Sequence, residues 1–308
     1  MHKYILKRLL MLIPVIIGVS FLVFFIMSLT PGDTARMILG EDAPEEALEA
    51  FREEQGLNDP VIVQYGRYMI KLVQGDLGIS YKTNRPVFKE IFTRFPDTLT
   101  LAFWGMIFAI VLSIPIGIIS ATKQYSVMDN VCMILALLGV ATPNFWLGLM
   151  LIIAFSLHLG WLPPAFQPGW KALILPVITL GTGAMANITR TTRSSMLEVV
   201  RQDYIRTAKA KGVSEKVTIW KHALKNALIP VVTVIGLQFG SLLGGAVLTE
   251  TVFAWPGVGT YMVNSIKAKD TPAVLGCVIM FSIGFSIVNL IVDILYAYID
   301  PRIKSKYQ

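Results

Sequence analysis

Long apolar runs make up most of this chain, and they limit what it can fold into. A helix that crosses a membrane needs roughly 20 apolar residues, because each residue adds about 1.5 Å against a hydrocarbon core of about 30 Å. Six runs fall in or near this range: Leu9–Leu29, Leu99–Ala121, Val131–Leu157, Ala172–Thr189, Ala227–Leu248 and Ala273–Ile299. We therefore predict an all-α integral membrane protein with six transmembrane helices.

The overall composition agrees with a membrane protein. Charged residues are 15% of the 308 positions, against about 25% in soluble domains. The net charge of +7 does not indicate a nucleic-acid binder, because the basic residues are distributed between the apolar runs. Cys132 and Cys277 both lie inside apolar runs, which argues against a disulfide framework or a zinc site.

The first and the fourth apolar runs differ from ordinary membrane spans. The first follows a basic start and resembles a secretory signal, but it is too long for one and is expected to remain as a membrane span. The fourth is diluted by Thr179, Gly181, Thr182, Gly183 and Asn187. We expect this helix to be shielded by other protein rather than by lipid.

The distribution of lysine and arginine predicts the orientation. Nine basic residues fall in the short segment 190–225, and basic residues favour the cytoplasmic side. The N- and C-termini are then cytoplasmic, and the long segment 30–97 is external. The predicted divisions are 1–29 (tail and first span), 30–97 (external subdomain) and 98–308 (five-helix core).

The segment 30–97 carries its own helix signals. Pro44 is followed by Glu45 and Glu46, and acidic residues suit the positive end of a helix. Leu48, Phe51 and Leu57 supply a weak apolar face. We expect a small subdomain with one or two helices, and the alternative is a disordered loop.

A basic island, DYIRTAKAKGVSEKVTIWKHALKNALIP at 203–230, interrupts the apolar pattern. A first helix is expected over Asp203–Lys211, with Gly212 ending it and Ser214 capping the next. Apolar residues recur at helical spacing in the second helix: Val217, Trp220, Leu224 and Leu228. This apolar face needs a groove, which lipid headgroups, the protein's own spans or a soluble partner could each supply.

The island resembles the cytoplasmic coupling loop of permease subunits of bacterial ATP-binding-cassette importers, although Arg206 stands where that loop has glutamate. Four further stretches resemble the dipeptide, oligopeptide and nickel branch of these importers. They are YILKRLLMLIP at Tyr4–Pro14, LTPGD at Leu29–Asp33, GDLGIS at Gly75–Ser80 and FAWPGVGTYMVNSI at Phe253–Ile266.

The resemblance implies a permease subunit in the cell membrane that works with several partners. These are a second, homologous permease, two ATPase subunits that use ATP and Mg²⁺, and an extracytoplasmic solute-binding protein. This chain would bind no cofactor itself, and its loop at about 198–226 would dock on an ATPase. The implied coupling residues are Tyr204, Ile205, Thr207, Ala208, Ala210, Gly212, Val217 and Trp220. The alternative for this loop is a basic helix lying on anionic lipid.

Small and polar residues in the spans are candidates for a subunit interface or a translocation path. Gly236, Gly240 and Gly244 are spaced four residues apart, and small residues at this spacing allow close helix approach in lipid. This glycine stripe either lies at the interface with a partner permease or allows packing inside this subunit. The candidates are Asn187, Gly236, Gln238, Gly240, Ser241 and Gly244, with Thr179 as a further wall residue.

Two other features have competing interpretations. Asp293 is an acid deep in an apolar run; pairing with Arg190, Arg193 or a helix end is favoured over a proton relay. Trp255, Pro256 and Gly257 begin an external turn with an exposed aromatic, Trp255. This turn either seats a solute-binding protein or anchors the chain at the membrane interface.

The chain contains no phosphate-binding GxxxxGK[ST] loop, no HExxH motif and no evident nucleophile arrangement. A non-catalytic transport subunit is therefore predicted, with peptides as the solute and nickel or another small solute as the alternative. An ion-coupled secondary transporter and an intramembrane enzyme are weaker alternatives. The first would have an inverted repeat and embedded ionisable groups, and the second a catalytic dyad or metal ligands.

Overall fold

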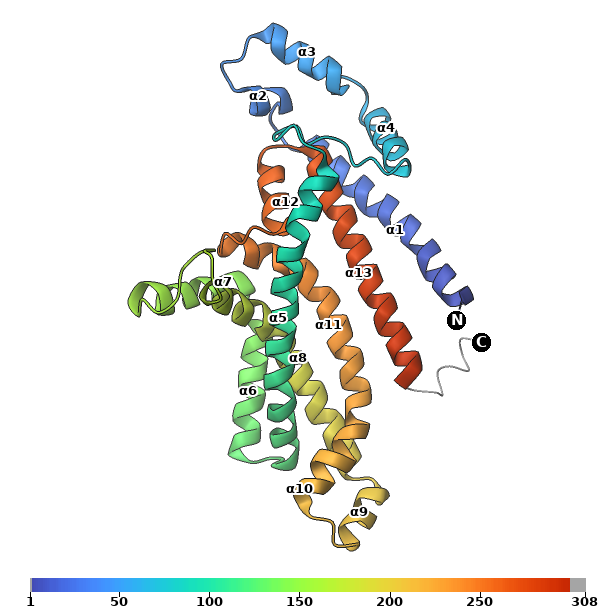
Figure 1. Ribbon diagram of the computed structural model, residues 1–308, viewed down its shortest axis with the longest axis vertical. Coiled ribbons are helices and arrows are strands. Elements are labelled where there is room, and N and C mark those ends of the chain that lie inside the picture. Colours follow the sequence, from blue (N-terminus) through green and yellow to red (C-terminus); the bar gives the residue numbers. More distant parts are fainter. Residues whose placement is uncertain (1, 300–308) are drawn as a thin grey trace. The chain divides into compact units, whose positions relative to one another are not determined.

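The computed structural model describes residues 2–299, with side chains for residues 8 and 10–294. This part of the chain is helical and has no β-strand (Figure 1). Its elements are α1 (His2–Leu29), α2 (Thr34–Leu39), α3 (Glu45–Gln55), α4 (Val61–Val73), α5 (Val87–Thr122), α6 (Val127–Ala141), α7 (Asn144–Leu151), the π-helix η1 (Ile152–His158), α8 (Lys171–Val200), α9 (Asp203–Ala210), α10 (Glu215–Val217), the π-helix η2 (Thr218–Ala223), α11 (Leu224–Val252), α12 (Val258–Lys267) and α13 (Thr271–Ile299). The predicted all-α class is confirmed.

Five helical segments are long and apolar enough to cross a membrane. They are α1, α5, α8, the continuous run from α10 through α11, and α13. The sixth predicted span differs from a straight rod, because α6 and the α7–η1 segment meet at an angle of 105°. Together they count as one broken span, so the described residues contain up to six spans.

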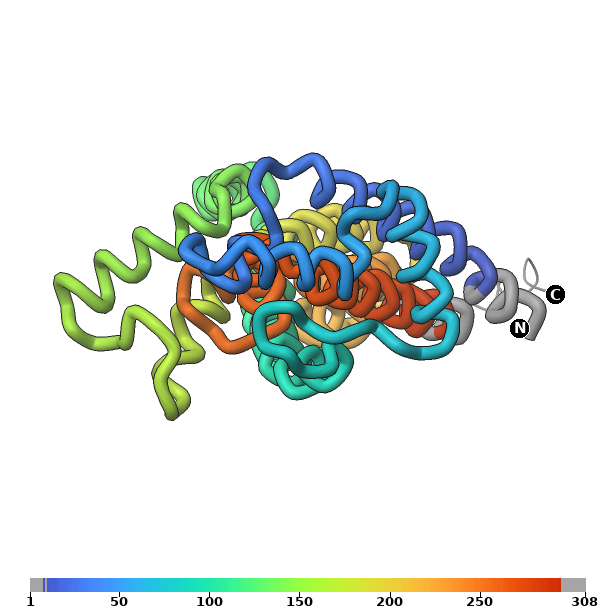
Figure 2. The backbone as a smooth tube through the Cα atoms, turned by 90° about the horizontal axis from the view of Figure 1, so that it is seen from above, coloured from blue at the N-terminus to red at the C-terminus, as the bar shows by residue number. Residues whose placement is uncertain are grey.

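Pro143 explains the break in the third predicted span. A proline restricts the residue before it to extended backbone, and Thr142 has φ −79° and ψ 122°. Pro143 then stands at the N-cap of α7. The α7–η1 segment projects sideways from α6 in both views (Figures 1 and 2). The apolar run alone did not reveal this bend, because hydropathy is continuous across it.

The described chain divides into two compact units. Within the described residues, one comprises 2–5, 99–255 and 285–299, and the other comprises 6–98 and 256–284. We call them the core unit and the outer unit. The predicted division at 29/30 and 97/98 remains a prediction.

In the core unit, α8 is the central helix. Leu180, Ala184 and Ile188 on α8 are buried in one cluster with Leu242 and Ala246 of α11. Of the candidate spans, α8 is the most buried: 61% of its most apolar stretch lies inside the protein. The expectation that protein shields the fourth run is confirmed. The small residues of α8 explain how neighbouring helices approach it so closely. A β-carbon on Gly181, for example, would stand 2.6 Å from the carbonyl oxygen of Gly105.

The outer unit contains three helices between α1 and α5, where one or two were predicted. The additional element is the short α2, which Asp33 caps by accepting a hydrogen bond from the amide of Ala35. Helix α3 begins after Pro44, as predicted, and Leu48 on it is fully buried. The hydrogen bond from Arg52 holds the pKa of Asp33 below its usual value, so the cap remains charged at neutral pH.

Two neighbouring residues, Lys269 and Asp270, hold the loops of the outer unit. The ammonium group of Lys269 donates to the carbonyl oxygens of Thr30 and Gly32, at the end of α1. The carboxylate of Asp270 accepts from the Ser80 hydroxyl and from the amide of Tyr81. The LTPGD and GDLGIS stretches are therefore the loops that this pair organises.

Candidate functional site

The island forms a helix, a glycine turn and a second helical segment, as predicted. Helix α9 ends in a Schellman arrangement: the amide of Val213 donates to the carbonyl of Ala208, and that of Gly212 to the carbonyl of Lys209. Gly212 has φ +80°, where a β-carbon would cause strain. The predicted role of Gly212 as the residue that makes this corner is confirmed.

The second segment begins at Ser214 but differs in detail from the prediction. Ser214 occupies the N-cap position, yet its side chain makes no capping hydrogen bond. After α10 the chain forms the π-helix η2 before it continues as α11. A π-turn changes the angular register of the side chains. Leu224 and Leu228 consequently pack against the core, whereas Val217 and Trp220 are exposed.

The eight predicted coupling residues fall into three groups. Tyr204, Val217 and Trp220 are exposed large side chains, at 42%, 42% and 48%. Thr207, Ala210 and Gly212 are exposed and small, and Ala208 is half-buried. Ile205 is only 1% exposed, so it cannot contact a separate protein as it stands. We call Tyr204, Val217 and Trp220 the coupling surface.

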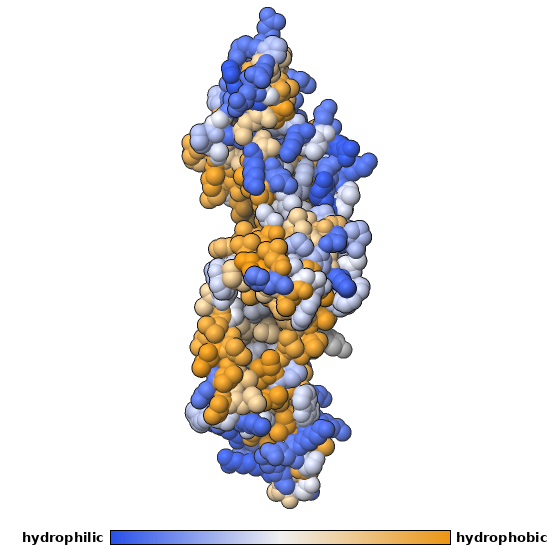
Figure 3. Space-filling view, turned by 90° about the vertical axis from the view of Figure 1, so that its left-hand side faces the viewer, coloured by the Kyte–Doolittle hydropathy of each residue, from blue (hydrophilic) through white to orange (hydrophobic). Residues whose placement is uncertain are grey.

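Ile205 anchors the hairpin to the helices behind it. It is buried in one cluster with Met196, Ala223 and Ala227, and with Ile118 of α5. The Tyr204 hydroxyl also accepts a hydrogen bond of 2.7 Å from the side-chain amide of Asn226 at the start of α11. Hydrophilic residues gather at the lower end of Figure 3, where α9 and α10 lie, and hydrophobic residues dominate the helices above it. The hairpin thus presents exposed apolar side chains within a polar surface and is fixed to the bundle through its inner face.

Asp129 is a structural residue of this region that sequence reasoning missed. Its carboxylate is 2% exposed and accepts two hydrogen bonds of 2.7 Å from the Arg193 guanidinium, one from the Ser120 hydroxyl and one from the Tyr125 amide. It therefore ties the end of α5 and the start of α6 to α8. The available signal was Ser126, which precedes Asp129 at capping-box spacing and accepts from its amide.

The glycines of the α11 stripe lie in two different environments. A β-carbon on Gly236 would lie 2.2 Å from Val292, and one on Gly240 would lie 3.0 Å from the ring of Phe285. These two glycines allow α11 to pack against α13 inside the same subunit. A β-carbon on Gly244 would meet nothing within 4 Å, so only this end of the stripe is open.

The open face of α11 carries Ser241 and Gly244, both exposed, and Gln238 is half-buried beside them. On α8, Asn187 is half-buried. Thr179, in contrast, is fully buried, and its hydroxyl donates to the carbonyl of Leu175. Thr179 is therefore an internal packing residue, and the expectation that it lines a polar passage is wrong.

The turn that begins at Trp255 is more buried than predicted. Trp255 is only 6% exposed and packs edge-on against Phe166, with ring centroids 5.0 Å apart. In the outer unit, Gly257 is buried and caps α12, while Pro256 is half-buried. The expectation of an exposed aromatic at this turn is wrong, because Trp255 belongs to the hydrophobic core of its unit.

Arg193 forms an ion pair with Asp129, and the suggested pairing of Asp293 with Arg190, Arg193 or a helix end stays a prediction. Among the residues that the structure describes, no three histidine, cysteine or acidic side chains are arranged to hold a metal ion.

Family models and similar proteins both identify this chain with membrane components of transport systems. Residues 113–305 match the model of the binding-protein-dependent transport system inner membrane component, and residues 1–102 match the N-terminal model of the same membrane component. The dipeptide transport system permease protein DppB of Alkalihalophilus pseudofirmus is 48% identical, over 99% of this chain and 100% of that protein. The glutathione transport system permease protein GsiC of Escherichia coli K12 is 44% identical, also over 99% of this chain and all of that protein.

Solved structures show the same fold. The inward-facing MetNI methionine ABC transporter matches with a TM-score of 0.56 at 16% identity, covering 68% of this chain and 96% of that chain. Permease subunits of this kind are non-catalytic, and separate ATPase subunits hydrolyse ATP. The chain therefore belongs to the binding-protein-dependent transport system inner membrane component family, and it is a multi-pass inner-membrane permease subunit of an ABC importer.

Proposed function

We propose that this permease passes short peptides, and that it forms one half of their path across the membrane. The observation that supports this substrate class is the high identity, over the full chain, to permeases whose names specify a dipeptide and glutathione, both of them short peptides. Selectivity would be shared with a solute-binding protein that delivers the peptide.

The coupling surface supplies the contact with the motor. Tyr204, Val217 and Trp220 fit an apolar cleft on an ATPase subunit, and Ile205 transmits its movement into α5, α8 and α11 through the buried cluster behind it. This arrangement supports protein docking rather than lipid binding, because the Gly212 corner and the buried anchor make the hairpin a stiff projection. ATP and Mg²⁺ would be held entirely by two such ATPase subunits.

A second, homologous permease would complete the path. We assign its contact to the exposed end of α11 at Ser241 and Gly244, with Gln238 and Asn187 facing the passage. Gly236 and Gly240 are excluded from this interface, since they pack against α13. Pro256, which is half-buried, remains a candidate for the surface that meets the binding protein, whereas Gly257 is buried.

The substrate class is tested by uptake. Cells that lack this chain should lose the uptake of a radiolabelled dipeptide, and plasmid expression of the chain should restore it. Labelled nickel and a free amino acid, measured in the same cells, are the comparison solutes. Unchanged dipeptide uptake in the deletion strain, together with lost nickel uptake, would refute the peptide assignment.

Orientation is tested separately by cysteine labelling. In a chain with Cys132 and Cys277 replaced by serine, a cysteine at Ser214 should react with a membrane-impermeant maleimide only after the cells are opened, because the basic island is predicted to be cytoplasmic. A cysteine at the exposed residue Ser241 serves as a membrane-depth control. Labelling at 214 in intact cells would reverse the predicted topology.

A further inference from the structure

The outer unit contains a cavity of about 380 Å³ that the coupling surface and the helix stripe do not involve. Its walls come from α3, α4, the loop at 76–84 and the start of α13. This volume lies at the small end of the range of about 300–1,000 Å³ that ligand sites occupy. Its size therefore suits a small molecule rather than a protein segment.

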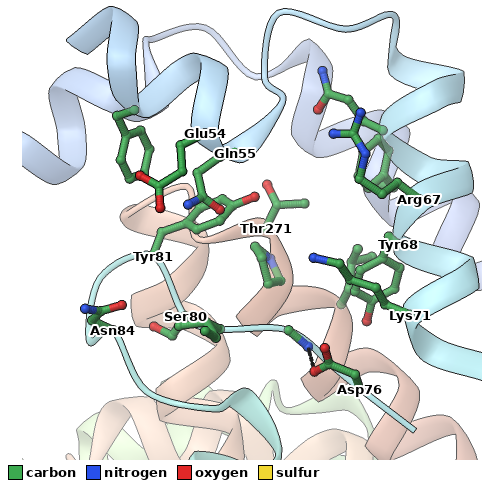
Figure 4. A pocket seen from close by; sticks show the side chains of 17 residues that line it. Glu54, Gln55, Arg67, Tyr68, Lys71, Asp76, Ser80, Tyr81, Asn84 and Thr271 are labelled. Atoms are coloured by element: carbon green, nitrogen blue, oxygen red, sulfur yellow. Dashed lines mark hydrogen bonds between the residues drawn. The ribbon is translucent and has the colours of Figure 1, made fainter. Parts of the chain in front are cut away.

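Cationic side chains line one side of the cavity and a glutamate lines the other. Asp76 lies below Lys71 in Figure 4, where its carboxylate accepts a hydrogen bond from the Gly78 amide. Figure 4 shows Lys71 and Arg67 extending from α4 on one side, and Glu54 and Gln55 with Tyr81 on the other. A cation-bearing wall opposite a carboxylate is the arrangement that binds a molecule with one anionic and one cationic end, since each end forms a charge-assisted hydrogen bond.

Arg67 is already neutralised, which leaves Lys71 as the available cation. The Arg67 guanidinium forms an ion pair with Asp59. It lies over Gly56, where a β-carbon would stand 1.9 Å from it. Within the described part of the chain, neither Lys71 nor Glu54 has an ion-pair partner, so both charges are available to a ligand.

The wall on the Glu54 side also suits an ammonium group. The rings of Phe51 and Tyr81 meet edge-to-face, with centroids 5.9 Å apart, and both line the cavity. Aromatic rings attract cations. Burial, followed by the charge of Asp270, raises the pKa of Tyr81 to about 12, so its phenol stays neutral and able to donate a hydrogen bond.

This wall is held in place before any ligand arrives. The Asp270 carboxylate accepts from the amides of Tyr81 and Lys82, and the Asn84 amide donates to the carbonyl of Ser80. On the facing side, Tyr65 and Tyr68 of α4 are buried against Phe24 of α1. Pre-organised walls reduce the entropy lost on binding.

We propose that this cavity binds a small zwitterion of the size of a dipeptide, with its carboxylate at Lys71 and its ammonium group at Glu54. The cavity would be a holding site within the outer unit. Its link to transport rests on the proposed peptide function, whereas binding itself does not.

The test uses the full-length chain purified in detergent and titrated calorimetrically with alanyl-alanine. Saturable binding is expected, and Lys71→Gln and Glu54→Gln should each weaken it about tenfold, which is the loss of one charge-assisted contact of about 1.4 kcal/mol. Lys89→Gln and Glu53→Gln alter exposed residues of the same unit that do not line the cavity. These matched controls should bind as the wild type does.

Analogues assign each end of the ligand. Alanyl-alanine amide should bind weakly and be insensitive to Lys71→Gln, and N-acetyl-alanyl-alanine should be insensitive to Glu54→Gln. Free alanine, whose charges are too close to reach both walls, should bind less well than the dipeptide. Absence of saturable binding, or equal affinity in the four variants, would overturn the site. Failure of peptide uptake with intact binding would instead overturn the transport proposal alone.

Discussion

Replacing Trp220 by aspartate should abolish substrate-stimulated ATP hydrolysis while leaving the permease folded. Trp220 is 48% exposed, so its removal leaves no cavity in the core. A tryptophan at the centre of a protein interface typically contributes about 2 kcal/mol or more, which corresponds to roughly thirtyfold weaker docking. Introducing a carboxylate adds the cost of desolvating a charge. The measurement is ATPase activity and dipeptide uptake in proteoliposomes that contain the whole transporter.

Two neighbouring variants make this test specific to the coupling surface. Trp220→Phe keeps an apolar ring and should retain most of the coupling. Lys221→Ala alters the next residue, which is exposed but polar, and should behave as the wild type does. If Trp220→Asp retained full stimulation, the hairpin would not be the ATPase contact.

The sequence predicted this hairpin well because its signals are local. The helix over 203–210, the Gly212 corner and the segment after Ser214 all follow from residues within a few positions of one another. Which side chains face outward was harder to predict. Ile205 and Trp220 were assigned to one surface, yet Ile205 is buried against Ala223 and Ala227. The π-helix that shifts this register leaves no mark in the hydrophobic pattern.

Elsewhere, the failures involve contacts between residues that are distant in sequence. Trp255 was expected to be an exposed aromatic in an external turn, but Phe166 packs edge-on against it. For the glycine stripe, the sequence left open an interface with a partner permease and packing inside this subunit. The structure separates Gly236, where a β-carbon would meet Val292, from the open Gly244. Hydropathy locates the helices in such a chain, whereas it does not determine which neighbour each helix face meets.

Asp129→Ala should destabilise the permease more than any exposed substitution near the hairpin. Removing one partner of a buried ion pair costs about 3–5 kcal/mol, because the remaining charge loses its compensation. Here the cost should fall at the lower end, since the Arg193 side chain is 21% exposed and water can partly solvate it. We expect a clear decrease in the apparent unfolding temperature in detergent. Glu198→Ala, at an exposed acidic residue of the same unit, is the matched control and should change stability by no more than about 0.5 kcal/mol.

A double-mutant cycle separates the ion pair from general loss of packing. Arg193→Ala leaves the 2%-exposed Asp129 carboxylate without its cation, so it should cost at least as much as Asp129→Ala. The double variant should be less destabilised than the two single costs added together, because neither charge is then left alone. Strictly additive costs would mean that the two side chains do not stabilise each other. Coupled costs, accompanied by reduced transport in the surviving fraction, would make the Asp129–Arg193 pair part of the rigid connection through which α8 follows the movement of the hairpin.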